Sequence, residues 1–152
     1  VGEMQKAREE VRSAKAQSSG KKSVMIIDDS KSIRALVKFV LQSDGYEVIE
    51  AEDGDQGWDL IQRLGDSLSL VLTDCEMPNM SGMELVEKVR EQSKYDSIAI
   101  VMLTSRKEEE DEVIGLDSGA DDYICKPVEP MKLQARVRKM IGMYDRISSS
   151  VH

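Results

Sequence analysis

Val71-Leu72-Thr73-Asp74-Cys75-Glu76-Met77-Pro78 is the stretch that decides the fold. Its apolar start predicts a buried strand that ends at Asp74, and the proline that closes the stretch predicts a loop. Ser81 precedes Glu84 by three residues, a capping-box pattern that predicts the start of a helix. Asp74 is therefore expected at the carboxyl end of a parallel strand, which is where open α/β sheets bind ligands.

The same alternation of short apolar strands and amphipathic helices runs through most of the chain. The predicted strands are 23–27, 46–51, 68–73, 98–103 and 123–125. Helices are predicted after them, capped by Ser30, Asp53, Ser81 and Ser105, with the last begun by Pro130. Five βα units predict an α/β fold: a doubly wound, flavodoxin-like parallel sheet of five strands in the order 2-1-3-4-5, with helices on both faces.

The first 22 residues differ from the rest of the chain. They carry six basic and three acidic side chains, a net charge of +3, which leaves −11 for residues 23–152. Residues 1–22 are interpreted as a polar helical arm or linker, with a weak coiled coil as the alternative. Residues 23–144 are predicted to form one domain, and residues 145–152 a tail.

Composition excludes several classes of protein. The net charge of −8 argues against direct binding to nucleic acid, and no apolar run reaches the ~18 residues of a membrane helix. A cytoplasmic location without membrane insertion is therefore expected. The sole histidine is His152, which rules out histidine-based metal or triad chemistry. Cys75 and Cys125 lack metal-site spacing and are interpreted as packing residues, with a redox sensor as the alternative.

Acidic side chains follow the first and third predicted strands. Because the strand order places these strands side by side, Asp28, Asp29 and Asp74 are expected to converge. Three neighbouring carboxylates repel each other, and an all-oxygen donor set suits Mg²⁺, with Mn²⁺ as a substitute. Thr104 and Lys126 follow the fourth and fifth strands and complete a phosphoryl-binding set. Asp74 is the natural nucleophile of this set.

Taken together, these motifs resemble the receiver domain of two-component response regulators, the CheY-like family, over residues 23–144. The residues that carry the resemblance are Asp28-Asp29, Asp74-x-x-Met77-Pro78-x-x-x-Gly82, Thr104-Ser105 and Tyr123-x-x-Lys126-Pro127. Each motif is weak alone, but their order and spacing together are specific. The resemblance implies a phosphorylation-switched signalling domain that is not an enzyme beyond its own phosphorylation and dephosphorylation.

The resemblance also implies a role for each matching residue. Asp74 would accept a phosphoryl group from a histidine kinase or phosphotransfer protein, and Lys126 would pair with that group beside a cis Lys126–Pro127 peptide. Thr104 would move to a phosphoryl oxygen and Tyr123 would turn inward behind it. From the residues alone, Thr104 and Tyr123 could equally be ordinary strand residues.

Metal ligands follow from the same resemblance. Asp29 and Asp74 would bind Mg²⁺ directly, together with the backbone carbonyl of Glu76, and Asp28 would act through a metal-bound water. Glu76 and Arg106 stand where this family tunes loss of the phosphoryl group, although both could be solvated surface charges.

The predicted helix over 105–119 is expected to be the softest, because consecutive acids and Gly115 weaken it. The resemblance implies that it forms an output surface with the fifth strand and last helix, facing a downstream domain or protein. The arm at residues 1–22 suggests a receiver within a hybrid kinase or multidomain regulator.

Three other classes of protein are weighed against a receiver. A pseudo-receiver would keep the fold and never take phosphate. An aspartyl-phosphate hydrolase of the haloacid dehalogenase type would use an acid at the position of Glu76, but the chain has no cap domain. A dinucleotide-binding domain is excluded, because no G-x-G-x-x-G follows the first strand.

Overall fold

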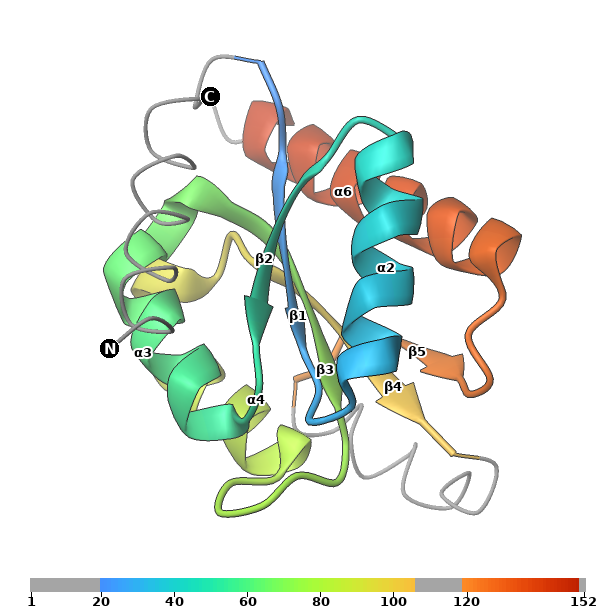
Figure 1. The fold of residues 1–152 in the computed structure, drawn as a ribbon. Coiled ribbons are helices and arrows are strands. Elements are labelled where there is room, and N and C mark those ends of the chain that lie inside the picture. Colours follow the sequence, from blue (N-terminus) through green and yellow to red (C-terminus); the bar gives the residue numbers. More distant parts are fainter. Residues whose placement is uncertain (1–19, 106–118, 151–152) are drawn as a thin grey trace.

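The computed structural model describes residues 20–105 and 119–150. Within these ranges one parallel sheet forms in the order β2-β1-β3-β4-β5, as the sequence predicts (Figure 1). The strands are β1 Ser23–Ile27, β2 Glu47–Ala51, β3 Leu68–Asp74, β4 Ala99–Thr104 and β5 Asp122–Cys125. All strands run in one direction, so their carboxyl ends share the lower edge of the sheet in Figure 1.

Helices cover both faces of this sheet. They are α2 Lys31–Ser43, α3 Gly54–Leu64, α4 Gly82–Arg90 and α6 Pro130–Ser150, with short 3-10 turns η1 Gly65–Ser67 and η2 Ser93–Tyr95. α2 and α6 lie on one face and α3 and α4 on the other (Figure 1). Each face therefore has its own apolar core, one centred on Ile61 and Ile100 and the other on Val37 and Leu72.

Side-chain caps fix where the helices begin, because the first N–H groups of a helix have no partner within it. The Ser30 hydroxyl accepts from the Ile33 N–H, the Asp53 carboxylate from the Gln56 N–H, and the Ser81 hydroxyl from the Glu84 N–H. All three caps lie just beyond the carboxyl ends of strands. The caps thus set the geometry of the loops at that edge.

A hydrogen-bonded cluster around Arg90 closes the opposite, amino-terminal edge of the sheet. The Arg90 guanidinium at the end of α4 donates to the carbonyls of Tyr95, Ile98 and Gly119. It also donates to the Asp121 carboxylate at 3.0 Å and to the Tyr144 hydroxyl at 3.2 Å. Because these partners precede β4 and β5 or lie on α6, one side chain ties four parts of the fold together.

Two aromatic rings meet on one face of the sheet. Trp58 of α3 meets Tyr95 of η2 edge to face, with ring centroids 5.9 Å apart. The Lys88 ammonium of α4 lies 6.0 Å from the Trp58 ring centroid. This contact joins α3, α4 and η2 on one face of the sheet.

The structure differs from the sequence prediction at the end of the chain and does not describe some of the predicted segments. α6 continues to Ser150 through residues assigned to a tail, because no proline or capping glycine follows Tyr144. Residues 1–19 and the predicted helix up to residue 118 lie outside the described residues. Among the helices of the described ranges, none is long and apolar enough to cross a membrane.

Candidate functional site at the carboxyl edge

Three carboxylates meet where β1 and β3 end, as the sequence predicts. One oxygen from each of Asp28, Asp29 and Asp74 lies within 4.8 Å of the others. Asp28 is fully buried, Asp74 is 8% exposed and Asp29 is exposed. The cluster is therefore buried on one side and open to solvent on the other.

The main chain after β1 is held by hydrogen bonds on every side. The Asp28 N–H donates to the Ala51 carbonyl of β2 at 3.1 Å, and an Asp28 carboxylate oxygen accepts from the Ser30 N–H at 2.9 Å. The Asp28 carbonyl accepts from Nη1 of Arg34 at 2.7 Å. The sequence analysis missed Arg34, although a charged residue three positions before Val37, on the apolar side of α2, is a signal that could have identified it.

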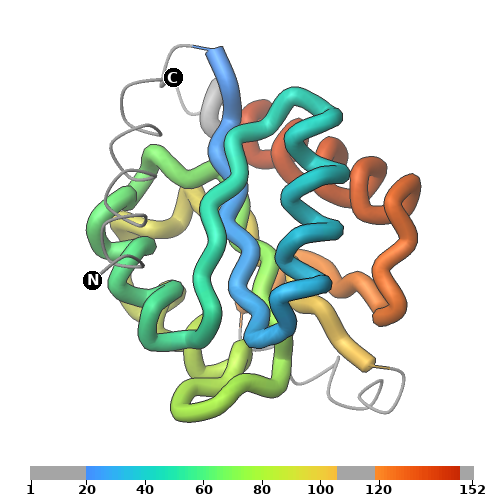
Figure 2. The backbone as a smooth tube through the Cα atoms, viewed as in Figure 1, coloured from blue at the N-terminus to red at the C-terminus, as the bar shows by residue number. Residues whose placement is uncertain are grey.

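The loop between β3 and α4 protrudes beyond the carboxyl edge of the sheet (Figure 2). The Gly82 N–H donates to the Cys75 carbonyl at 2.9 Å. A Cβ at position 82 would overlap the Asp74 carbonyl oxygen, so only glycine lets α4 begin this close to β3. The glycine of the Met77-Pro78-x-x-x-Gly82 motif thus has a steric reason.

Lys126 brings one positive charge to the acids. Its Nζ lies 3.1 Å from Asp74 Oδ1 and 3.2 Å from Asp28 Oδ2. The Lys126–Pro127 peptide that precedes α6 is cis, as predicted. Burial alone would lower the pKa of Lys126, but the charges of Asp74 and Asp28 outweigh burial and raise it.

The same surroundings disfavour a charge on Asp74. Burial raises the pKa of Asp74, the charge of Asp28 raises it further, and Lys126 opposes both effects only in part. Three carboxylates and one ammonium leave a formal charge of −2. Because every side-chain donor of the acid cluster is an oxygen, the cluster suits a hard divalent cation such as Mg²⁺.

Thr104 and Tyr123 occupy neighbouring strands and are both buried. Asp74 pairs in register with Leu103, so Thr104 stands one residue nearer the open edge. Tyr123 pairs with Met102 and packs in the core on the α3 and α4 side. The structure thus buries both residues on strands beside the acids, with Thr104 at the carboxyl edge and Tyr123 further from it.

The remaining predicted residues are only partly placed. Glu76 is exposed beyond Asp74, while Arg106 lies outside the described residues. Cys75 is partly buried and packs against the core, which fits the packing interpretation. Cys125 is exposed at the end of the edge strand β5.

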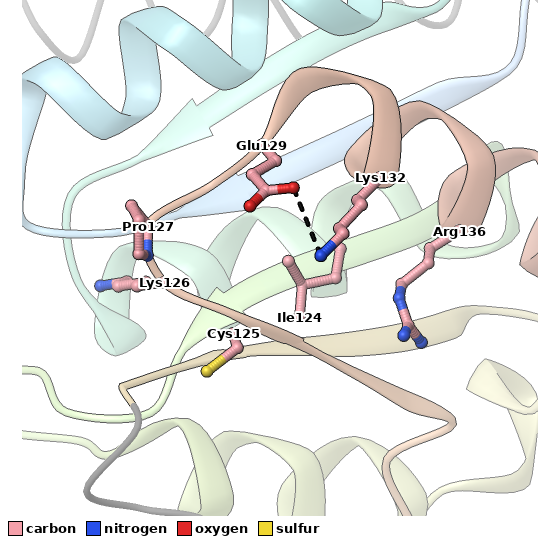
Figure 3. A pocket seen from close by; sticks show the side chains of 7 residues that line it. All are labelled: Ile124, Cys125, Lys126, Pro127, Glu129, Lys132 and Arg136. Carbon is pink, nitrogen blue, oxygen red and sulfur yellow. Dashed lines mark ion pairs between the residues drawn. The ribbon is translucent and has the colours of Figure 1, made fainter.

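A shallow pocket of about 140 Å³ lies on the other side of the Lys126–Pro127 turn. Cys125, Lys132 and Arg136 line it, and Lys126 points away from Lys132 and Arg136 (Figure 3). Lys132 pairs with Glu129 at 3.3 Å and Arg136 with Asp122 at 2.9 Å. Lys126 lines this pocket too, so the lysine lies between the pocket and the acid cluster.

Proteins with similar sequences point to the same kind of domain as this geometry. The family model "Response regulator receiver domain" matches residues 24–138. The phosphate regulon transcriptional regulatory protein PhoB of Escherichia coli is 39% identical over 119 residues, which cover 78% of this chain and 51% of PhoB. A chemotaxis protein CheY homologue of Campylobacter jejuni is 34% identical over 120 residues, covering 78% of this chain and 92% of that protein. The chain thus spans about half the length of the PhoB proteins it matches.

Solved structures agree with the sequence matches. The chemotaxis response regulator CheY4 of Vibrio cholerae superposes with a TM-score of 0.74 at 35% identity, over 79% of this chain and 98% of CheY4. A response regulator receiver domain protein of Clostridium thermocellum gives a TM-score of 0.77 at 26% identity, over 83% and 98% of the two chains. With its sheet order, its acid cluster and these matches, the chain belongs to the family of response regulator receiver domains.

Proposed function

We propose that Asp74 is the phosphoacceptor of this receiver and that its phosphorylation switches the domain. The observation that carries the proposal is the geometry around Asp74: the Lys126 ammonium lies 3.1 Å from one carboxylate oxygen, and two further acids lie within 4.8 Å. Lys126 is placed to stabilise charge on phosphoryl oxygens, and the open side of the cluster admits a donor.

The transfer step conserves atoms and charge. An Asp74 carboxylate oxygen forms a bond to phosphorus, and the bond from phosphorus to the donor breaks, with the electron pair leaving on the donor. The donor is the phosphohistidine of a histidine kinase or phosphotransfer protein. Hydrolysis returns the Asp74 carboxylate and inorganic phosphate, so the domain catalyses only its own phosphorylation and dephosphorylation.

Mg²⁺ is the proposed cofactor, with Mn²⁺ as a substitute. Asp29, Asp74 and the Glu76 carbonyl would bind it directly, and Asp28 would act through a bound water. When bound, the cation supplies positive charge that offsets the repulsion among the acids and the phosphoryl oxygens. Asp28 and Lys126 orient the Asp74 carboxylate from the buried side.

Thr104 and Tyr123 are the proposed relay from Asp74 to a partner surface. Both are buried on adjacent strands, with Thr104 at the carboxyl edge and Tyr123 further from it, so a movement of Thr104 toward the phosphoryl group would change the packing around Tyr123. β5 and α6 would form part of the output surface, which faces a downstream domain or protein. A cytoplasmic location, and a place within a hybrid kinase or multidomain regulator, stay predictions of the sequence.

Intact-mass measurement tests the proposal directly. After incubation with acetyl phosphate and Mg²⁺, we expect a single phosphoryl adduct on the wild type and none on Asp74→Asn. EDTA should prevent the adduct, and Asp66→Asn, an exposed acid in η1, should label like the wild type. Folded wild-type protein that takes no phosphoryl group under any condition would instead identify a pseudo-receiver.

The hydrolase alternative needs its own assay. A haloacid dehalogenase-type enzyme would turn over p-nitrophenyl phosphate repeatedly, whereas a receiver releases no more phosphate than its own labelling supplies. We expect no sustained turnover, and we expect Glu76→Ala to change the lifetime of the adduct without creating turnover.

A further inference from the structure

A buried arginine lies directly behind the acid pair at the end of β1. Arg34 lies on the first turns of α2 and is only 8% exposed. Its Nη1 donates to the Asp28 carbonyl at 2.7 Å, and its Nε donates to the Glu50 carboxylate of β2 at 3.3 Å. Nη2 lies 3.9 Å from the Glu52 carboxylate. The guanidinium thus bridges β2 to the turn that carries two of the three acids.

The Asp28 carbonyl is the acceptor end of the Asp28–Asp29 peptide unit. Because that unit is planar, a bond to its carbonyl oxygen fixes the plane from which the Asp29 side chain departs. The Ala51 carbonyl and the Ser30 N–H hold the other two sides of Asp28. Lys126 holds the far oxygen of the Asp28 carboxylate, and Arg34 holds the carbonyl. Because the guanidinium is planar and forked, it satisfies Asp28 and Glu50 at once.

We infer that Arg34 is a positioning residue for divalent-cation binding, acting through the main chain of Asp28 and Asp29. Residues that do not touch the ion can still orient the groups that bind it. The inference rests on the proposed function, since it assumes that the acid cluster binds a cation. Glu50 in turn holds Arg34, so the orientation of the acids depends on a contact between α2 and β2.

Calorimetric titration of the unphosphorylated protein with Mg²⁺ is the closing experiment. We expect Arg34→Met to weaken Mg²⁺ binding by about tenfold, the lower end for loss of such a partner. Arg34→Lys keeps the charge but reaches one acceptor at a time, and should weaken binding less. Lys38→Met is the matched control, because Lys38 also pairs with Glu50, at 3.4 Å, with no bond to Asp28.

A second readout separates positioning from chemistry. The rate of labelling by acetyl phosphate should return close to the wild-type value when Mg²⁺ saturates Arg34→Met, because Asp74 and Lys126 are unchanged. Thermal melts identify a temperature at which every variant is folded, and Arg34→Lys serves if Arg34→Met does not fold.

The outcomes distinguish the inference from the proposed function. If the wild type binds Mg²⁺ and folded Arg34→Met or Arg34→Lys binds equally well, Arg34 is only a structural residue and the inference is overturned. Equal weakening by Lys38→Met would also overturn it, because the effect would then come from Glu50 alone. A wild type that binds neither Mg²⁺ nor Mn²⁺ would overturn the cofactor proposal together with this inference.

Discussion

Asp74 sits in surroundings that oppose its own charge. Burial and the neighbouring Asp28 raise the pKa of Asp74, and Lys126, shared between the two acids, compensates only in part. A cation bound among the acids would relieve part of this repulsion. The proposed phosphoacceptor is thus also a local weakness of the metal-free fold.

Asp74→Asn should therefore stabilise the metal-free domain. We expect the free energy of unfolding to rise by roughly 0.5–1 kcal/mol in EDTA, because solvent screens part of the repulsion that is relieved. Lys126 keeps Asp28 as a partner in this variant. Urea denaturation measures the change, and saturating Mg²⁺ should reduce or reverse it by stabilising the wild type. Destabilisation of the variant in EDTA would contradict this view of Asp74.

Residue-level predictions from sequence succeeded where a side chain ends a strand. Asp28, Asp29 and Asp74 had to meet once the strand order was known, because carboxyl ends of parallel strands share one edge. Arg34 could not be assigned in this way, since its function depends on a contact with Glu50 that only the packing of α2 on β2 creates.

At the scale of elements, α4 begins in direct contact with the end of β3. Gly82 is the first helical residue, and its N–H binds the Cys75 carbonyl. The absence of a side chain is what allows that approach. The start of α4 therefore fixes the main chain at Asp74 and Cys75.

Gly82→Ala should accordingly destabilise the domain, by about 2–3 kcal/mol, because the added methyl group overlaps backbone that cannot move aside. Gly142→Ala is the matched control, since that glycine lies inside α6 with open space around its Cβ position. It should stabilise the domain by up to about 1 kcal/mol through helix propensity. Urea denaturation of both variants checks the pair, and equal effects would refute the steric argument.

Element boundaries were predictable where a cap or a breaker marks them. Ser30, Asp53 and Ser81 cap helices in the structure as their sequence patterns predict. α6 carries no such mark after Tyr144, so its continuation to Ser150 was missed. Helix propensity there is not interrupted, and the sequence offers no other signal for an end.

At the scale of the whole molecule, the two edges of the sheet carry different groups of side chains. The carboxyl edge gathers like charges, whereas the amino-terminal edge is closed by the Arg90 cluster. Arg90→Lys should lower the free energy of unfolding by about 2 kcal/mol or more, because a single ammonium leaves buried acceptors without donors. Arg63→Lys, an exposed residue paired with Asp59 one turn away, should change it by less than about 0.5 kcal/mol. If the denaturation curve of Arg90→Lys coincided with that of the wild type, the Arg90 cluster would not stabilise the fold.

Tyr144 makes the stability of this edge depend on pH. Burial, followed by the hydrogen bond to Asp121, raises the pKa of Tyr144 to about 12 from 10.0. Between these values the unfolded chain loses a proton that the folded protein retains, so the free energy of unfolding falls as the pH rises. The advantage of wild type over Tyr144→Phe should therefore be largest below pH 10 and shrink toward pH 12. A difference that stayed constant with pH would show that the Tyr144 hydroxyl has the same pKa in the folded and unfolded states.

Trp58 gives the molecule a built-in optical probe. It is the sole tryptophan of the chain, and its edge contact with Tyr95 allows excitation energy absorbed by the tyrosine ring to pass to the indole. Emission from Trp58 therefore registers whether α3 and η2 are together, on the side of the sheet away from α2. In a Cys125→Ser background, loss of that transfer during denaturation, timed against the reaction of Cys75 with a thiol reagent, would show whether the edge that holds the acids opens before the rest of the domain.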